Sequence, residues 1–336
     1  MKIAAALLVT AVWINLARAA KTLDVYDIDV EGGKCVLIVS PSGESMLIDV
    51  GWPGFHGRDA DRIVTALRAA GLKQIDYLVI SHYDIDHLGD VPLLVSKFPA
   101  KHIVDHGPME ANKPASKQYQ AYAEVRDKMD HITVTPGDRI PIKGVDVLVV
   151  MSAGKRIEKP VKGAGAPNPL CATTKPEPER AQDIEDNMSI GLLFTMGKFR
   201  MLDFSDLESA YDYKLMCPNN PVGSVDVYQV SIHGQDKGVS PVLAQALHAR
   251  VALMGNGPLK GGAPQTWETL RGAAGLEDIW QVHYSVAGGK EHNPPVSFIA
   301  NPEGADEAHW IKLSAQANGT FTVTNSRNGF SKRYGK

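Results

Sequence analysis

Residues 81–90 read Ser-His-Tyr-Asp-Ile-Asp-His-Leu-Gly-Asp, which places four side chains suited to metal binding close together. They follow residues 75–80, whose apolar end predicts a strand covered on both faces. Imidazole and carboxylate groups are ligands for zinc and, with more carboxylate, for manganese. We therefore predict metal ligands at the end of a buried strand, namely His82, Asp84, Asp86 and His87.

Strands and helices alternate on both sides of this stretch. Short β-branched runs separated by turn residues predict a strand meander over residues 23–50, and a helix that Asp59 caps and Gly71 ends follows it. A strand at 75–80 and a helix at 88–97 complete the first unit, and a similar alternation recurs over residues 225–283. This order predicts an α/β protein with two sheets packed face to face and helices outside. The Pro- and Gly-rich residues 153–182 are expected to form a long loop that borders a site.

The motif at residues 82–87 resembles the signature of the metallo-β-lactamase superfamily, His-x-His-x-Asp-His. Asp84 stands where the second histidine is usual, and this departure is similar to the branch that contains the soluble domain of the competence protein ComEC. The meander through Leu47-Ile-Asp-Val-Gly51 resembles the first motif of the family. The resemblance implies the αββα four-layer sandwich, two mixed β-sheets flanked by helices, over residues 21–336. It also implies that Asp49 supports the metal loop without being a ligand.

Two later positions match the remaining ligands of the family. Asp206 matches the carboxylate that touches both ions, with Asp203 as the competing candidate in the same stretch, and His233 matches the last histidine. A further histidine for the first ion is not evident, which leaves the third ligand of that ion open. Asn187, in a stretch that resembles the Asn-x-Ser of the ComEC-like branch, either helps there, binds substrate, or has only a role in a turn.

Two histidines at predicted strand ends are candidates for completing the site. His106 is either a functional residue or an ordinary loop histidine. His283 lies where related enzymes often place a histidine that faces the substrate or donates a proton, so we predict that it assists the leaving group.

A pair of divalent ions, zinc with manganese as the alternative, predicts a hydrolase that uses a metal-bridging hydroxide. Asp86 is expected to orient the nucleophile, and the anionic Asp84 favours a phosphoester as substrate. The alternatives are a lactone or amide hydrolase of β-lactamase type, an enzyme with redox-active iron, and a metal-containing binding protein without turnover.

The N-terminus predicts export. Lys2, an apolar stretch and the small residues around Arg18 are typical of a signal peptide over residues 1–20, and a membrane-spanning helix is not expected after its cleavage. Removal of these two basic residues from the formal net charge of −3 leaves −5, and no dense basic run is present. We therefore expect a periplasmic or secreted protein with a small-molecule substrate, and long nucleic acids are disfavoured.

The cysteines are too few for a thiolate metal cluster. Cys35 falls in an alternating strand pattern and is expected to be buried, which leaves Cys171 and Cys217 as the candidate disulfide.

Overall fold

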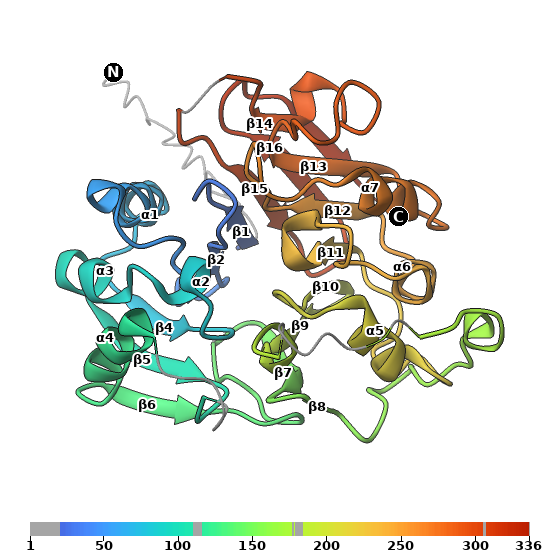
Figure 1. The fold of residues 1–336 in the computed structure, drawn as a ribbon, viewed down its shortest axis with the longest axis horizontal. Helices are drawn as coiled ribbons and strands as arrows, with labels where there is room; N and C mark the ends of the chain where they lie inside the picture. Colours follow the sequence, from blue (N-terminus) through green and yellow to red (C-terminus); the bar gives the residue numbers. More distant parts are fainter. Residues whose placement is uncertain (1–20, 110–115, 177, 179–183, 305–306, 336) are drawn as a thin grey trace, which may run out of the picture.

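Two β-sheets lie face to face in the computed structural model, which describes residues 21–109, 116–176, 178, 184–304 and 307–335 (Figure 1). The expected signal peptide over residues 1–20 lies outside these ranges. Within them, the first sheet has nine strands in the order β17-β16-β15-β1-β2-β3-β4-β5-β6. Its strands are β1 (Leu23–Asp27), β2 (Val36–Val39), β3 (Ser45–Ile48), β4 (Ile75–Val79), β5 (Ala100–Asp105), β6 (Asp130–Thr133), β15 (Ile311–Ala315), β16 (Phe321–Asn325) and β17 (Ser331–Tyr334).

The second sheet of the described chain has eight strands in the order β14-β13-β12-β11-β10-β9-β7-β8. Strands β10 to β14 pair in parallel, whereas β9 pairs antiparallel with β10 and with β7. The sheet is therefore mixed, as predicted. Its strands are β7 (Asp146–Ser152), β8 (Lys155–Arg156), β9 (Gly191–Met196), β10 (Phe199–Asp203), β11 (Val227–Gln229), β12 (Val251–Met254), β13 (Asp278–His283) and β14 (Ile299–Asn301).

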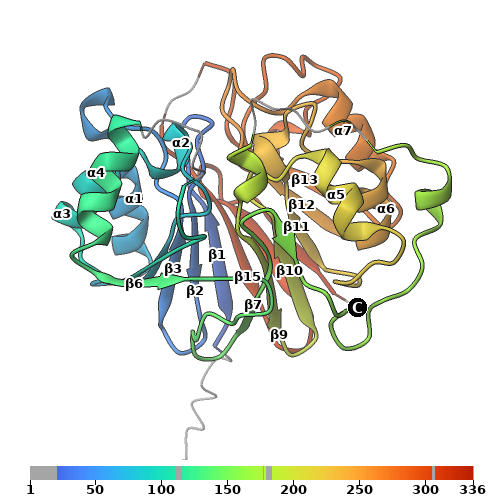
Figure 2. The same ribbon diagram turned by 60° about the horizontal axis from the view of Figure 1, so that its bottom comes forward.

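Helices cover the outer face of each sheet, which gives four layers (Figure 2). One apolar cluster joins the first sheet to its helices, a second joins the other sheet to its helices, and a third lies between the sheets. Strand β4 shows why this arrangement holds, because Leu78 packs under the helices while Val79 packs between the sheets. The helices are α1 (Arg58–Ala69), α2 (Ile85–Leu88), α3 (Val91–Lys97), α4 (Lys117–Arg126), α5 (Ser209–Met216), α6 (Pro241–Leu247) and α7 (Pro264–Arg271). Short 3-10 helices are η1 (Phe55–Gly57), η2 (Pro169–Ala172), η3 (Asp186–Met188), η4 (Ser231–Gly234) and η5 (Val296–Phe298).

The first long helix corrects one detail of the sequence prediction. Gly57, in the left-handed region, is the N-cap of α1, and Asp59 lies inside the first turn. The carboxylate of Asp59 is buried and accepts hydrogen bonds from the backbone N–H of Trp52 and from Nε of Arg58. Asp59 therefore joins the preceding loop to the helix instead of capping it. The helix expected at 88–97 begins later than predicted, at Val91, and is α3, which the short α2 precedes.

The cysteines lie as predicted. Cys171 and Cys217 form a disulfide that links η2 to the end of α5, and Cys35 is a buried free thiol. The predicted loop over 153–182 contains only the short β8 and η2 among its described residues. No helix of the described chain combines the length and the apolar character needed to cross a membrane.

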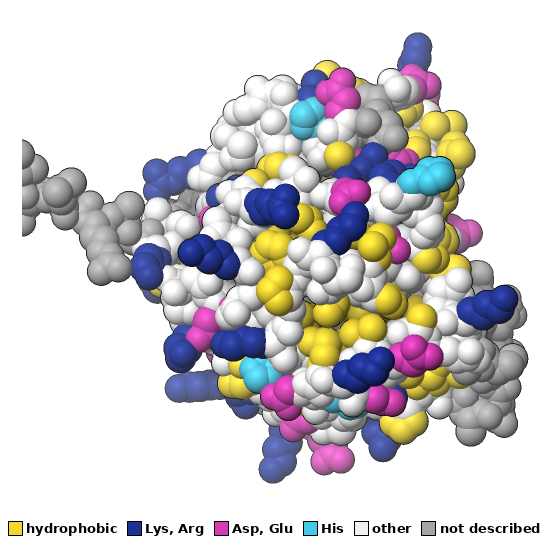
Figure 3. Space-filling model, turned by 90° about the vertical axis from the view of Figure 1, so that its left-hand side faces the viewer, with side chains coloured by type: hydrophobic (Ala, Val, Ile, Leu, Met, Phe, Trp, Pro, Cys, Tyr) yellow, Lys and Arg dark blue, Asp and Glu magenta, His cyan; other side chains and the backbone are white. Residues whose placement is uncertain are grey.

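The face that carries α1, α3 and α4 has apolar side chains near its centre, with lysines and arginines around them (Figure 3). Partly buried residues of these helices, including Leu93 and Val125, pack against the apolar cluster beneath. The helical layer is thus amphipathic, with its apolar side towards the sheet.

Candidate metal centre

The loop after β4 carries the first group of predicted ligands. Asp84 is the N-cap of α2, and Asp86 and His87 lie within that helix. The loop is held by Asp49, whose carboxylate accepts hydrogen bonds from the backbone N–H of Ser81 at 2.8 Å and from its hydroxyl at 2.6 Å. Asp49 also lies 2.8 Å from Nδ1 of His87. It therefore supports the loop, as the resemblance implies.

The second sheet supplies the facing ligands. Strands β10 and β11 are parallel neighbours, so the residues that follow them emerge at the same edge. Asp206 comes after β10, and His233 lies in η4 after β11. His233 and Ile232 both adopt positive φ, at 53° and 47°, which is rare outside glycine and is concentrated at functional sites. The backbone here turns sharply and directs the imidazole of His233 towards Asp206.

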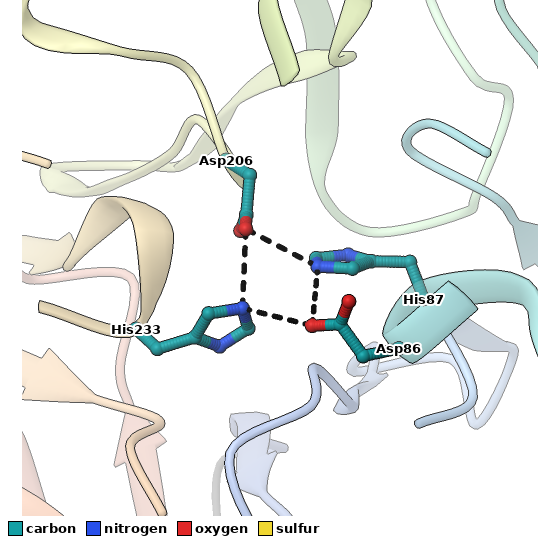
Figure 4. Close-up of side chains that lie close together, drawn as sticks. All are labelled: Asp86, His87, Asp206 and His233. Carbon is teal, nitrogen blue, oxygen red and sulfur yellow. Dashed lines mark ion pairs between the residues drawn. The ribbon is translucent and has the colours of Figure 1, made fainter. Parts of the chain in front are cut away.

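Asp86, His87, Asp206 and His233 converge on one point from both sheets (Figure 4). Nε2 of His233 lies 3.2 Å from Asp86 Oδ2 and 3.1 Å from Asp206 Oδ2. Nε2 of His87 lies 3.4 Å and 3.3 Å from the same two oxygens. All four residues are buried. Four of the side chains that the sequence predicts as metal ligands therefore lie together in the structure.

A second group lies beside it and consists of His82, Asp84 and Asp186, whose candidate ligand atoms all lie within 4.8 Å of one another. Nε2 of His82 is 3.8 Å from Asp186 Oδ1. The rings of His82 and His87 are 4.0 Å apart between centroids, so the two groups are neighbours. Asp186 thus lies with two of the predicted ligands, His82 and Asp84.

Several buried ligand atoms of these residues form no hydrogen bond, and they fit metal ions. Nε2 of His82, His87 and His233 is buried, and none has a hydrogen-bond partner among the described residues. The same holds for Oδ1 of Asp206. Such atoms are costly to bury unless something binds them, and their donor set of imidazole and carboxylate suits zinc or manganese. The arrangement fits two divalent cations.

The pKa values at the centre reflect this crowding. Burial lowers the pKa of His82 to about 4, so its imidazole is neutral and able to act as a ligand. Burial, together with the carboxylates of Asp206 and Asp84, raises the pKa of Asp186 to about 8. For His87 the carboxylates around it outweigh burial and raise its pKa well above 6.5. Cations would relieve this accumulation of negative charge.

Asp186 is positioned by Lys237, which the sequence did not indicate as a site residue. Lys237 Nζ lies 3.1 Å from Asp186 Oδ2 and 3.2 Å from Glu208 Oε1. Asn187 donates a hydrogen bond from Nδ2 to Glu208 Oε2 at 3.1 Å. The structure thus places Asn187 beside the centre, with its amide directed to Glu208, while its neighbour Asp186 lies among the candidate ligands.

His106 lies behind the same turn. Its Nε2 is 3.1 Å from Glu185 Oε1, and that oxygen also accepts a hydrogen bond from the backbone N–H of Tyr83 at 3.0 Å. Both side chains are buried. His106 therefore helps to join the turn before Asp186 to the loop after β4, and it is not one of the clustered ligands.

Asp203, the competing candidate, has a different partner. Its Oδ1 forms a buried ion pair with Lys34 at 2.6 Å. A small cavity of about 10 Å³ lies beyond this pair and is lined in part by Asp27, Asp206 and His233. Asp206 rather than Asp203 faces the histidines, as predicted.

The structure places His283 in a separate cluster. Its Nε2 lies 2.6 Å from Asp29 Oδ1 and 3.4 Å from Glu31 Oε1, and Arg62 pairs with both of these carboxylates. His283 is buried at the end of β13. Within the described chain, the ion pairs of His283 are with Asp29 and Glu31, neither of which is a predicted metal ligand.

A hollow beside the predicted loop does not coincide with the metal centre. It has a volume of about 920 Å³, and its lining comes mainly from residues 154–162, within the predicted loop. The backbone N–H of Ala153 donates to the carbonyl of Met188 at 3.0 Å, which places this loop beside η3. The loop thus borders the turn that carries Asp186.

The comparison with protein families agrees with this fold. Residues 28–162 match the model of the metallo-beta-lactamase superfamily. The matched residues include the loop after β4. The chain has a metallo-β-lactamase fold. The matched region supports membership of the superfamily, and the metallo-β-lactamase fold extends beyond it through both sheets. No curated protein matches the chain in sequence.

Solved structures similar to this chain are distant in sequence. The metallo-β-lactamase fold protein YhfI from Bacillus subtilis is 14% identical, with a TM-score of 0.46, over 77% of this chain and 96% of that one. A protein from Parabacteroides distasonis, proposed to be a metal-dependent hydrolase, is 15% identical, with a TM-score of 0.42, over 76% of this chain and 92% of that one. CmlA, a diiron β-hydroxylase from Streptomyces venezuelae, is 13% identical, with a TM-score of 0.38, over 76% of this chain and 48% of that one.

Proposed function

We propose that this chain is an exported, dinuclear metal-dependent hydrolase of the ComEC-like branch and that it cleaves phosphoesters. The observation that carries the proposal is the convergence of three buried imidazole nitrogens, none of which forms a hydrogen bond, with four carboxylates in two adjacent groups. A superfamily fold with such a centre suggests a metal-dependent hydrolase.

Each group would hold one ion. His82, Asp84 and Asp186 offer one nitrogen and two carboxylates, whereas Asp86, His87 and His233 offer two nitrogens and one carboxylate. Asp206 lies at the second group, and we propose that it also reaches the first. When bound, zinc or manganese would polarise a substrate oxygen and lower the pKa of a coordinated water towards about 7.

The ligand charges support a phosphoester as substrate. With neutral histidines, the four carboxylates balance two divalent ions in formal charge. A first site with two carboxylates is harder than a site of three histidines, and it suits oxygen-rich ligands such as phosphoryl groups. This preference favours a phosphoester over a β-lactam as the substrate.

The chain's own residues would orient the reacting groups. Asp86 is in contact with His87, His233 and Lys260, which limits how its carboxylate can move and suits it to orient a nucleophile. Asp49 behind His87 fixes the orientation of the ring. Nε2 of His283 forms an ion pair with Asp29. Proton donation by His283 to the leaving group stays a prediction.

Export is supported by two features of the chain. The first residues have the composition of a signal peptide, and a disulfide joins Cys171 to Cys217. Disulfides persist mainly in oxidising compartments such as the periplasm. The acidic balance of the chain favours a small-molecule substrate over a long nucleic acid.

The test is metal analysis of the purified mature protein together with hydrolysis of bis-(p-nitrophenyl) phosphate. Wild type is expected to hold about two equivalents of zinc or manganese. Asp86→Ala and His233→Ala should lose turnover, while Asp236→Asn, which changes an exposed aspartate, serves as the matched control.

The outcomes separate the alternatives. Two equivalents of metal with turnover of a lactone or an amide alone would replace the phosphoester proposal. Bound metal without any turnover would indicate a binding protein, and protein without metal would refute the dinuclear centre.

A further inference from the structure

Lys260 lies beside the metal centre but is not one of the candidate ligands. It sits in the loop between β12 and α7, and its Nζ contacts Asp86 Oδ2. The ammonium group also lies 4.9 Å from the centroid of the Trp52 ring, a cation–π distance. The side chain of Lys260 is 28% exposed, whereas that of Asp86 is 8% exposed. Lys260 therefore contacts a buried candidate ligand and is itself partly exposed to solvent.

The loop that carries Lys260 is fixed to the metal site. The backbone N–H of Gly262 donates to the carbonyl of His233 at 3.1 Å, and that of Gly257 donates to the carbonyl of Lys260 at 2.8 Å. Lys260 is thus held beside two candidate ligands, Asp86 through its side chain and His233 through its loop.

The other lysines at the centre have a carboxylate partner that is not a candidate metal ligand. Lys34 pairs with Asp203, and Lys237 pairs with Glu208 as well as with Asp186. Within the described chain, the ion pair of Lys260 is with Asp86, which is a candidate ligand. A cation bound by Asp86 would compete with Lys260 for the charge of that carboxylate.

We propose that Lys260 binds an anionic oxygen of the substrate beside the metal centre, so that the substrate carries a charged phosphoryl group. This inference rests on the proposed function and narrows it, because an uncharged lactone or amide would leave the ammonium group of Lys260 without a partner. The ring of Trp52 holds the ammonium in place before the substrate arrives, which reduces the entropy that binding costs.

The test is a calorimetric titration of the zinc-loaded full chain with inorganic phosphate. Lys260→Met is expected to bind phosphate roughly tenfold more weakly, as is typical of a lost charge-assisted hydrogen bond. Lys260→Arg keeps the positive charge and should stay within about threefold of wild type. Lys198→Met, which removes an exposed lysine at the β9–β10 turn, should match wild type.

Metal content separates this role from a structural one. The proposal requires that Lys260→Met keep the two metal equivalents of wild type. Loss of metal would make Lys260 a counter-ion of Asp86 and overturn the proposal, as would unchanged phosphate binding in Lys260→Met or no phosphate binding by wild type. If Lys260→Met does not fold, Lys260→Gln is measured in its place and judged by the same criteria.

The titration does not depend on turnover. Phosphate binding that requires Lys260, in a protein that does not hydrolyse phosphoesters, would refute the proposed function and leave the anion site standing. Phosphoester hydrolysis together with phosphate binding that is independent of Lys260 would support the proposed function and refute the anion site at Lys260.

Discussion

The carboxylate of Asp49 lies 2.8 Å from Nδ1 of His87, so the opposite nitrogen of the ring is directed towards Asp86 and Asp206. The same carboxylate accepts hydrogen bonds from Ser81, which precedes the ligands in sequence. One buried side chain thus positions both an individual ligand and the loop that carries it.

Asp49→Asn is expected to weaken metal binding by about 10- to 100-fold, the usual effect of losing the hydrogen-bonded partner of a ligand histidine. The amide keeps the size of the side chain but loses the charge that favours Nδ1–H on His87. Competition with a chelator measures the affinity. An affinity equal to that of wild type would show that Asp49 only shapes the loop.

Asp186→Asn should lower the metal content from about two equivalents to about one. The change removes the charge of one of the three candidate ligands in the group with His82 and Asp84, while the second group keeps all of its residues. Metal analysis after dialysis measures the stoichiometry, with Asp236→Asn as the control for an exposed aspartate. Two tightly bound equivalents in Asp186→Asn would exclude Asp186 as a ligand.

Gly261→Ala is expected to displace His233. At this position φ is +86°, and an added Cβ would lie 2.0 Å from the carbonyl oxygen of His233, so the backbone has to move. Gly71→Ala is the matched control, because φ is +76° there and the surrounding space is open. The control should cost about 1 kcal/mol of stability and leave metal content unchanged.

Metal affinity and thermal unfolding measure both glycine variants. Gly261→Ala should bind the second metal equivalent at least about tenfold more weakly. Equal metal affinity in the two variants would mean that the loop after β12 does not control the position of His233.

Much of the fold could be predicted because its signals are local. Alternating apolar runs and turn residues located most strands, and the density of ligands after β4 located the metal loop. The convergence of Asp206 and His233 on that loop was predicted only through the resemblance, since strand pairing between distant segments has no local signal. The structure places both of them there.

The parts that were missed depend on contacts over long sequence distances. Asp186 adjoins Asn187, a candidate from the sequence, but nothing in the sequence distinguishes a ligand from its neighbour in a turn. Lys260 meets Asp86 across 174 positions. Asp59 was predicted as a helix cap because aspartate is a preferred N-cap residue. Its hydrogen bonds with Trp52 and Arg58 determine its place instead.

Removal of the disulfide should destabilise the second sheet and its helices without changing the metal ligands. Cys171 and Cys217 are 46 positions apart. Closing a loop of that length lowers the entropy of the unfolded chain, which raises the free energy of unfolding by roughly 4 kcal/mol at 25 °C. Cys171→Ser/Cys217→Ser is expected to unfold at lower denaturant concentration than wild type. Adding a reducing agent should shift wild type in the same direction and leave the double variant unchanged; a shift in the double variant would point to another cause.

Asp27 predicts a pH-dependent term in stability. Burial raises its pKa to about 6, although the hydrogen bond from Gln229 and the charge of Lys34 act in the opposite direction. The ordinary value is 3.8, so the folded state binds the proton more tightly than the unfolded state does. The free energy of unfolding should therefore fall as the pH rises from about 4 to about 6 and then level off.

Asp27→Asn keeps an oxygen that can accept the hydrogen bond from Gln229 Nε2, which is 2.8 Å in wild type, and it removes the buried charge. At pH 7.5 the variant should be more stable than wild type by up to about 3 kcal/mol, and near pH 4 the two should be equal. Urea unfolding of the chelator-treated proteins across this range measures the difference. Asp24→Asn, in the same strand, is the control and should give only a small change in stability. A constant difference between Asp27→Asn and wild type would mean that Asp27 is already ionised at pH 4 in the folded protein.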